Sequence, residues 1–578
     1  MINLKGSQNL IKTPDFTTAP KLEALIMEGC TRLVDVHPSI GVLKSLKLLN
    51  FRDCKSLRSL PTKIGMESLE TLILSVEYLP ENLQQAESLE ELDLSETSIK
   101  EPPSFFSKLK SLKVLSFIGC KGPSYKSRSN LPFLFKVIQG RRTNPIAPML
   151  PLLSGLSSLR ELNLRDCNLC KGDIPRDISG LSSLIHLDLS GNNFISIPAS
   201  LTQLSKLSFL DLSNCNMCTL GEADIHGLSS LSYLYLRGNY FITIPLALTQ
   251  LSRLKLLGLS NCKMLKSLPE LLTSIANLRI DDCSSLEVVA SPSKVRNLED
   301  RGIIRAINCF KLAENINALT LLKKYLKAFA NSRKKLDIMM PGSEIPEWFS
   351  QQKSDSSIKI PVPKDSQWIG VACCCIFVNN DASRDDEHTC CGVFIYFRNS
   401  EEASCNGSIF RGRNRREIDG SGWMVGKRYN EPIMKDHIFL RYWSRDKLYS
   451  HSWEDELYGH CETNNLWAPD CLDQKWDELE VRFTNLFGYG IKVKKCGVRI
   501  VYEKDLEEIK ELQCHTTQSS PNFEHIHQHS AHNDGSTDST SHIKRKANIY
   551  DEAEEEGPQP KRMQKFFNFM VRQQGKKH

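Results

Sequence analysis

The 578-residue sequence lacks any run of about 18 apolar residues, so no segment is expected to cross a membrane. Its first residues, MINLKGSQNLIKTPDF, have no basic stretch followed by an apolar run, which argues against a secretory signal peptide. An excess of one charge is also lacking, because 74 basic and 68 acidic residues are interspersed and leave a net charge of only +6. These absences predict a soluble intracellular protein for which neither a membrane nor a nucleic acid is an expected partner.

Motifs of catalytic sites are lacking as well. No G-x-S-x-G or H-E-x-x-H sequence occurs, and GSGWMVGKR at 420–428 has Ser421 where a phosphate-binding loop needs glycine and Arg428 where it needs serine or threonine. The sequence therefore predicts no catalytic residue, no cofactor-binding residue and no metal ligand, and we do not expect an enzyme.

Cysteine, by contrast, is plentiful, with 20 residues spread along the chain, but the spacing typical of small secreted disulfide domains is lacking. We expect reduced thiols. Most of the cysteines in the first half of the chain belong to a repeat.

A pattern L-x-x-L-x-L-x-x-C/N occurs eleven times between Leu22 and Cys283, at intervals of 20 to 25 residues with one doubled interval of 47. This period is typical of leucine-rich repeats. Each x-L-x-L-x segment predicts a short strand whose leucines point into a shared core, followed by a short helix that begins near a proline, as in IPASLTQL at 197–204. A cysteine or asparagine closes nine of the motifs, where it can satisfy buried backbone groups. These residues are Cys30, Cys54, Cys120, Cys167, Asn192, Cys215, Asn239, Cys262 and Cys283.

The residues between the leucines predict an exposed concave sheet, which is the binding surface of such solenoids. Outward positions include Glu91 and Asp93 in one repeat and Ser213 in another. Aromatic residues and arginine are enriched where partners bind most tightly. Our candidate protein-binding residues are Glu161, Arg165, His186, Asp188, Phe209, Asp211, Tyr233, Tyr235 and Arg237.

The segments CNLC (167–170) and CNMC (215–218) also have the C-x-x-C spacing of metal-binding cysteines. Each first cysteine is explained by the repeat, and the pairs lie two repeats apart, about 10 Å for stacked strands. A shared zinc ion is therefore not predicted.

The rest of the chain divides by composition. We predict a leucine-rich-repeat solenoid at 1–290 with an insertion at about 121–158, a helical connector at 291–336 and an all-β sandwich at 337–505. Candidate strands of the sandwich are 357–363, 368–378, 391–397, 437–443, 478–484 and 494–503. The polar tail at 506–578 is typical of disorder, and its basic clusters resemble a bipartite nuclear import signal, formed by Lys544, Arg545, Lys546, Lys561 and Arg562.

Several blocks resemble one family: PDFTTAPKLEALIMEGC at 14–30, INCFKL at 307–312 and MMPGSEIPEWFSQQ at 339–352. They are similar to the C-terminal half of plant intracellular immune receptors with TIR, nucleotide-binding and leucine-rich-repeat domains, within which the tobacco mosaic virus resistance protein N family is a named example. The resemblance implies an α/β leucine-rich-repeat horseshoe followed by the post-repeat jelly-roll domain of these receptors, the C-JID. Its signature segment would include Pro341, Gly342, Ile345, Pro346, Trp348 and Phe349, for which we expect a structural role.

The resemblance also implies a function in defence, the recognition of a pathogen effector or a guarded host protein, and association with the TIR and nucleotide-binding domains. Those domains are not expected in this sequence, so the NAD hydrolysis of the family is not carried over. The expected location is the cytoplasm and the nucleus. Two other functions remain open at this point: a cytosolic scaffold or adaptor, and an extracellular plant repeat receptor.

Overall fold

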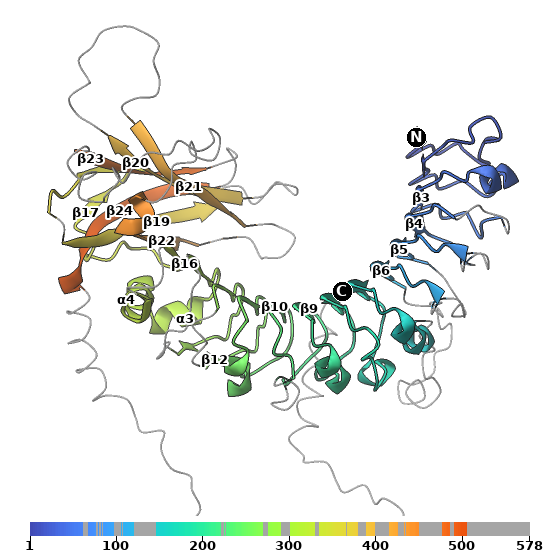
Figure 1. Cartoon of the computed structure of the whole chain (residues 1–578). Helices are drawn as coiled ribbons and strands as arrows, with labels where there is room; N and C mark the ends of the chain where they lie inside the picture. The colour runs from blue at the N-terminus through green and yellow to red at the C-terminus, as the bar shows by residue number, and fades with distance from the viewer. Residues whose placement is uncertain are drawn as a thin grey trace, which may run out of the picture. The chain divides into compact units, whose positions relative to one another are not determined.

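The computed structural model describes residues 1–505 apart from 62–66, 77–78, 80–82, 84, 98–105, 107, 121–145, 221–224, 226, 270–274, 291–300, 330–334, 366, 380–388, 399–414, 426–432, 434, 450–476 and 486–490. Most of the predicted insertion and the whole C-terminal tail, with its basic clusters, lie outside the described residues. Figure 1 shows the two parts treated below, the repeats and the sandwich.

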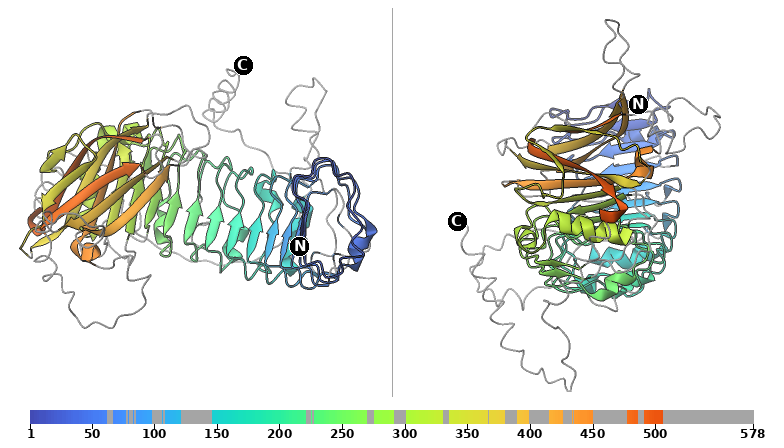
Figure 2. Two further views of the ribbon diagram at one scale, coloured as in Figure 1. Left: turned by 90° about the horizontal axis from the view of Figure 1, so that it is seen from above. Right: turned by 90° about the vertical axis from the view of Figure 1, so that its left-hand side faces the viewer.

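The first part is a solenoid whose strands form one parallel sheet, seen side by side in Figure 2. A leucine occupies the centre of nearly every strand, and the central residues pair in register from Leu25 through Leu162 to Leu278 and Ile304. The leucine-rich-repeat prediction is confirmed. The strands are β1 (Ile2–Asn3), β2 (Ala24–Ile26), β3 (Leu48–Phe51), β4 (Thr71–Leu74), β5 (Glu91–Asp93), β6 (Val114–Ser116), β7 (Glu161–Asn163), β8 (His186–Asp188), β9 (Phe209–Asp211), β10 (Tyr233–Tyr235), β11 (Leu256–Gly258), β13 (Asn277–Arg279) and β15 (Arg301–Arg305).

The return segments of the repeats are shorter than the predicted helices. They contain 3₁₀ turns, and Pro198 and Pro245 stand just before a turn and not inside it. A repeat of this length leaves only a few residues for the return, and the tighter 3₁₀ turn suits such short pieces. The turns are η1 (Pro38–Val42), η4 (Ala147–Gly155), η5 (Lys171–Asp173), η6 (Ala199–Gln203) and η7 (Leu246–Gln250), and a small ladder joins β12 (Ser267–Leu268) to β14 (Val288–Val289).

The closing cysteines and asparagines do what the sequence predicted. The thiol of Cys215 donates to the carbonyl oxygen of Leu189 in the preceding repeat at 3.2 Å, and Cys54 does the same to Met27 at 3.2 Å. Asn192 does more: its amide donates to the carbonyls of Leu164 and Leu189, at 2.9 and 2.7 Å, while its oxygen accepts the N–H of Leu169 at 2.9 Å. Backbone groups that the stacking buries are thereby satisfied.

The repeats continue past the point where we expected them to end. β15 pairs in parallel with β13, and the thiol of Cys309 donates to the carbonyl of Ile280 at 2.9 Å, as the other closing cysteines do. Part of the predicted connector is therefore a repeat. In the sequence RGIIRAINC the three leucine positions of the pattern hold Arg301, Ile304 and Ala306, so a search for leucine misses it.

Two helices follow the last repeat, α3 (Phe310–Asn315) and α4 (Ala318–Phe329). Ala318, Leu321, Leu322 and Leu326 of α4 are buried in the same core as the leucines of the repeats and as Ile338 of the next strand. The helices thus cover the end of the solenoid, which would otherwise expose its apolar interior.

The second part consists of two antiparallel sheets that pack around a second apolar core. Every segment that we predicted as a strand here is one. The first sheet runs β16 (Lys335–Pro341), β22 (His437–Ser444), β19 (Trp368–Asn379), β24 (Ile491–Tyr502) and β17 (Gln351–Lys353), with α5 (Arg445–Tyr449) after β22. The second runs β18 (Ser357–Pro361), β23 (Glu478–Asn485), β20 (Thr389–Arg398) and β21 (Arg415–Val425).

The two parts share one sheet, which the sequence did not predict. β15 of the last repeat pairs in parallel with β16, and β16 pairs antiparallel with β22 of the sandwich. The three consecutive cysteines of β19 alternate accordingly: Cys373 and Cys375 face the core between the two sheets, and Cys374 faces the core shared with the repeats. Thiols pack here as small apolar side chains.

Candidate functional site

The candidate site lies on the strand face of the repeats, where residues on either side of each central leucine form rows. One row runs Glu161, His186, Phe209 and Tyr233, because these residues pair in register across β7 to β10. The next row runs Asn163, Asp188, Asp211 and Tyr235, and continues through Gly258 to Arg279. The structure therefore brings most of the candidate residues together on four adjacent strands.

An aromatic cluster stands at the centre of these rows. The rings of His186 and Phe209 are 3.9 Å apart, and Phe209 lies 5.3 Å from Tyr235 and 6.4 Å from Tyr233. Tyr233 is 41% exposed, so its ring is accessible to a partner. We call His186, Phe209, Tyr233 and Tyr235 the aromatic patch. Arg165 and Arg237 each lie two residues beyond a strand position of these rows.

Two carboxylates border the aromatic patch. Asp188 accepts the N–H and O–H of Ser190, and Asp211 accepts the N–H of Ser213 at 2.8 Å. Burial, reinforced by the charge of Asp188, raises the pKa of Asp211 to about 6. Two carboxylates in one row make this edge of the patch acidic, and a cationic group would relieve their repulsion.

Two of the positions expected to be exposed are not. Asp93 is 7% exposed because Arg52, from two repeats earlier, donates a hydrogen bond to its carboxylate and covers it. Ser213 is also only 7% exposed. The alternation of a strand sets the direction of a side chain, but its exposure depends on the length of its neighbours.

Sequence reasoning missed the C-terminal end of the second row. There Gly258 has no side chain, and the ring of Tyr235 lies over it. Arg279 follows on the next strand and Arg305 on the one after. Aligning the repeats by their central leucine, and not only searching for leucines, would have revealed this run of glycine and arginines.

The signature segment of the post-repeat domain is packed against the first sheet and α4. Phe349 and Ile345 are buried, and a Cβ atom at Gly497 would lie 2.9 Å from Ile345, so the glycine allows this close approach. Trp348 is half-buried, with the Arg499 guanidinium 4.8 Å from its ring. Pro341 ends β16, Gly342 donates its N–H to the carbonyl of Asp436, and Pro346 accepts from Phe349.

Buried charges mark the junction between the last repeat and the sandwich. Arg441 and Asp337 are both fully buried, and the guanidinium donates two hydrogen bonds to the carboxylate, at 2.6 and 2.9 Å. Burial alone would raise the pKa of Asp337, but the charge and hydrogen bonds of Arg441 outweigh it and hold that pKa below its ordinary value.

A second buried polar contact, made by His437, joins the last repeat to the sandwich. Its Nε2 accepts the N–H of Asn308 in the last repeat at 2.9 Å, and its Nδ1 bonds to the carbonyl of Lys435 at 2.8 Å. Burial lowers the pKa of His437, in keeping with a neutral ring that uses both nitrogens.

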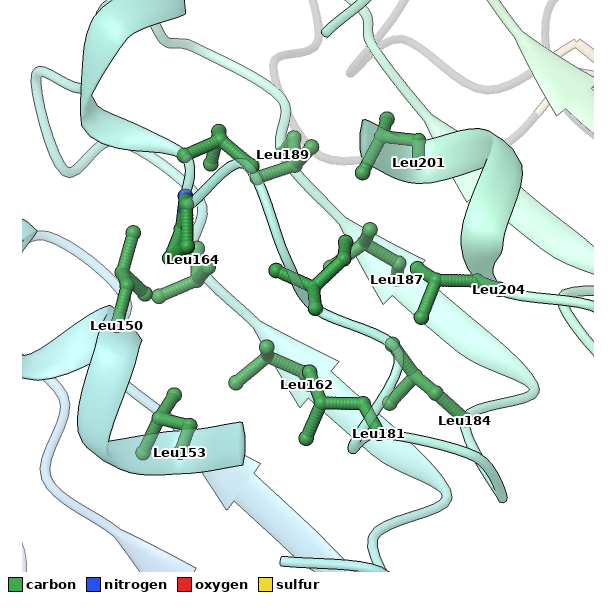
Figure 3. Close-up of a pocket in the computed structure, with 13 residues that line it drawn as sticks. Leu150, Leu153, Leu162, Leu164, Leu181, Leu184, Leu187, Leu189, Leu201 and Leu204 are labelled. Carbon is green, nitrogen blue, oxygen red and sulfur yellow. The ribbon is translucent and has the colours of Figure 1, made fainter. Parts of the chain in front are cut away.

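Figure 3 shows an apolar cavity inside the solenoid, between the repeats of β7 and β8 and the turns η4 and η6. Its volume is about 30 Å³, the space of roughly one water molecule, and leucines such as Leu162 and Leu187 line it. We interpret it as a packing gap, because it offers no polar group to orient a ligand. Within the described ranges, no helix is long and apolar enough to span a bilayer, and no three metal-ligating side chains are grouped.

Comparison with known families identifies a match for each part, the sandwich and the repeats. The family described as C-JID domain matches residues 340–507, and the family described as Leucine Rich Repeat matches 88–109, 158–181 and 183–204. Neither is a catalytic domain.

Named relatives match the same region. Disease resistance-like protein DSC1 of Arabidopsis thaliana is 30% identical over 73% of this chain and 30% of its own length, and disease resistance protein RPP2B of the same plant is 30% identical over 88% and 43%. TMV resistance protein N of Nicotiana glutinosa is 31% identical over 38% of this chain and 24% of its own length. The chain thus spans less than half the length of these relatives.

Proposed function

We propose a function from the premise that this chain is the leucine-rich-repeat and C-JID region of a plant TIR-NBS-LRR disease resistance protein. The function is the recognition of a protein in defence: a pathogen effector, or a host protein that an effector alters. We place the contact on the exposed face of the repeats, and include the post-repeat domain, with a jelly-roll topology, in the recognising surface.

The observation that carries this proposal is the aromatic patch. The half-buried Phe209 and the exposed Tyr233 stand on adjacent strands with an acidic row beside them, and aromatic residues are enriched among the few that dominate binding energy at protein interfaces. In the same proposal Glu161, Arg165 and Arg237 form the charged rim. The signature residues around Trp348 have a structural role within the post-repeat domain, since most of them are packed against its first sheet.

The protein acts in the cytoplasm, and the basic clusters around Lys544 and Lys561 would carry it to the nucleus. The TIR and nucleotide-binding domains of such receptors are its natural partners in signalling. Any enzymatic activity belongs to those domains and not to the residues described here.

The test is a binding screen of the full chain against pathogen effector proteins and host proteins, followed by titration with each binder. Replacing Phe209, Tyr233 and Tyr235 with alanine should weaken binding by about tenfold or more. The matched control replaces Ile195, Ile242 and Leu246, which are 69%, 48% and 65% exposed but lie outside the strand face, and should leave affinity within about twofold. An unchanged affinity in the folded aromatic variant would exclude the patch.

A further inference from the structure

The second row of the strand face ends in a notch that the aromatic patch does not explain. In this row Tyr235 pairs with Gly258, Gly258 with Arg279, and Arg279 with Arg305. Because Gly258 has no side chain, the ring of Tyr235 lies over this position, on the side of Arg279. We call Tyr235, Gly258 and Arg279 the notch.

The glycine sets how Tyr235 lies. A Cβ atom at position 258 would stand 2.9 Å from Cδ1 of Tyr235, closer than real Cβ contacts allow, so the ring occupies the space that a side chain would need. The ring therefore leans along the sheet toward Arg279. Burial raises the pKa of Tyr235, and the charge of Arg279 is close enough to oppose that rise.

Arg279 differs from its neighbours in its lack of a carboxylate. Arg305 pairs with the buried Asp281 at 2.6 Å, and Arg301 pairs with Asp337 at 3.0 Å. Among the described residues, the guanidinium of Arg279 makes one hydrogen bond, from its Nε to Asn277 at 3.3 Å, and no ion pair. Asp281 acts on Arg279 only through its charge, which raises the pKa of Arg279, while its close contacts are to Arg305 and to the N–H of Ile307.

Within the described part of the chain, the positive charge of Arg279 is not neutralised by an ion pair. Arg279 is partly withdrawn from water, and the like charge of Arg305 stands one strand away. Burial and Arg305 both lower the pKa of Arg279. An incoming anion would restore the balance and use the planar fork of donors that remains on the guanidinium.

We propose that the notch binds a carboxylate side chain of the protein partner, with Arg279 as the ion-pair donor and the hydroxyl of Tyr235 as a second donor. This inference rests on the proposed function and adds a chemical requirement to it: an aspartate or glutamate next to the apolar residue that covers the aromatic patch. A carboxylate fits better than a phosphate, because one unpaired arginine balances one negative charge and Asp211, one strand from Tyr235, would repel a dianion.

A randomised peptide library displayed on phage tests this directly with the full chain as bait. Wild-type protein should enrich peptides with aspartate or glutamate at one position, about fivefold or more over the input library. Arg279→Gln should abolish that preference, and Arg279→Lys, which keeps the charge without the fork, should retain only part of it. Arg253→Gln removes an exposed arginine from a return segment and should leave the preference unchanged.

The outcomes separate this inference from the proposed function. Peptides that depend on Tyr233 but show no acidic preference, or an acidic preference that survives Arg279→Gln, would overturn the notch and leave the aromatic patch standing. Competition by millimolar inorganic phosphate, with no acidic enrichment, would identify a phosphate site instead. Gly258→Ala gives an independent check, because displacing the Tyr235 ring should reduce the acidic preference in a protein that melts like the wild type.

Discussion

The repeats and the sandwich bury polar groups in opposite ways. In the repeats the recurring buried contact is local and neutral: a thiol or an amide reaches one repeat back, as Asn192 does to Leu164. Buried carboxylates such as Asp93 and Asp281 are exceptions to this pattern. In the sandwich the buried contact is charged and joins residues far apart in the chain: Arg441 and Asp337 are 104 residues apart and fully buried as a pair. The two regions sit in one continuous sheet, so the difference arises from topology and not from the environment alone.

Each region keeps the register of its strands in its own way. A repeat needs only its neighbour, and the same small polar residue can close every copy. The sandwich joins strands from distant parts of the chain, and an ion pair in which neither partner can be lost alone can fix which strands meet. We hypothesise that Arg441 specifies the pairing of β16 with β22, because a buried ion pair is a weak source of net stability but a strict one for geometry.

The largest effect should come from breaking that pair. Arg441→Met leaves the Asp337 carboxylate buried without its strongest partner, although Arg301 and the charge of Lys335 remain. It should lower the free energy of unfolding by about 3–5 kcal/mol in urea titrations followed by tryptophan fluorescence. The double variant Asp337→Leu with Arg441→Met should recover most of this loss. The control Arg52→Met removes a half-exposed partner of Asp93 and should change stability by about 1 kcal/mol at most.

The next effect should come from a closing residue of the repeats. Asn239→Ala removes donors to the carbonyls of Leu212 and Leu236 and the acceptor of two backbone N–H groups, and should lower stability by about 3 kcal/mol. Asn239→Cys keeps one donor, as in the neighbouring repeats, and should lose less. Equal losses in the two variants would mean that the thiol is no substitute for the amide.

A smaller effect concerns the acidic edge of the aromatic patch. The folded-state pKa of Asp211 is raised from 3.8 to about 6, so its stabilising contribution is complete below pH 3.8 and is lost as the pH rises through 6. Asp211→Asn should therefore stabilise the protein at pH 7.5, by roughly 1 kcal/mol once solvent around the carboxylate is allowed for. Thermal melts at pH 4 should show no gain, and a gain of the same size at both pH values would contradict the assignment.

The smallest effect should be that of the exposed cysteines. Cys170 and Cys218 are exposed, whereas burial raises the pKa of Cys54, Cys215 and Cys262 to about 12. Maleimide labelling of the native protein at pH 7.5, mapped by mass spectrometry, should modify the first two and spare the other three. Replacing Cys170 and Cys218 with serine should change stability by less than about 0.5 kcal/mol. Rapid labelling of Cys215 would show that the repeats open locally.

Much of the candidate site could be predicted because strand alternation is a local rule. The spacing of leucines placed Phe209, Tyr233 and Tyr235 on neighbouring strands, and the rings are indeed in contact distance of one another. The notch could not be predicted in the same way. The role of Gly258 depends on the Tyr235 ring that lies over it, and the role of Arg279 depends on the ion pair between Arg305 and Asp281.

The sequence by itself determined the repeat, its period, its closing residues and the strands of the sandwich, because each of these depends on residues that are close together in the chain. Only the tertiary structure decided that the repeats extend to Cys309, that β16 joins the two regions in one sheet, and that Arg441 meets Asp337. These features depend on contacts between distant segments, whose partners no local pattern specifies.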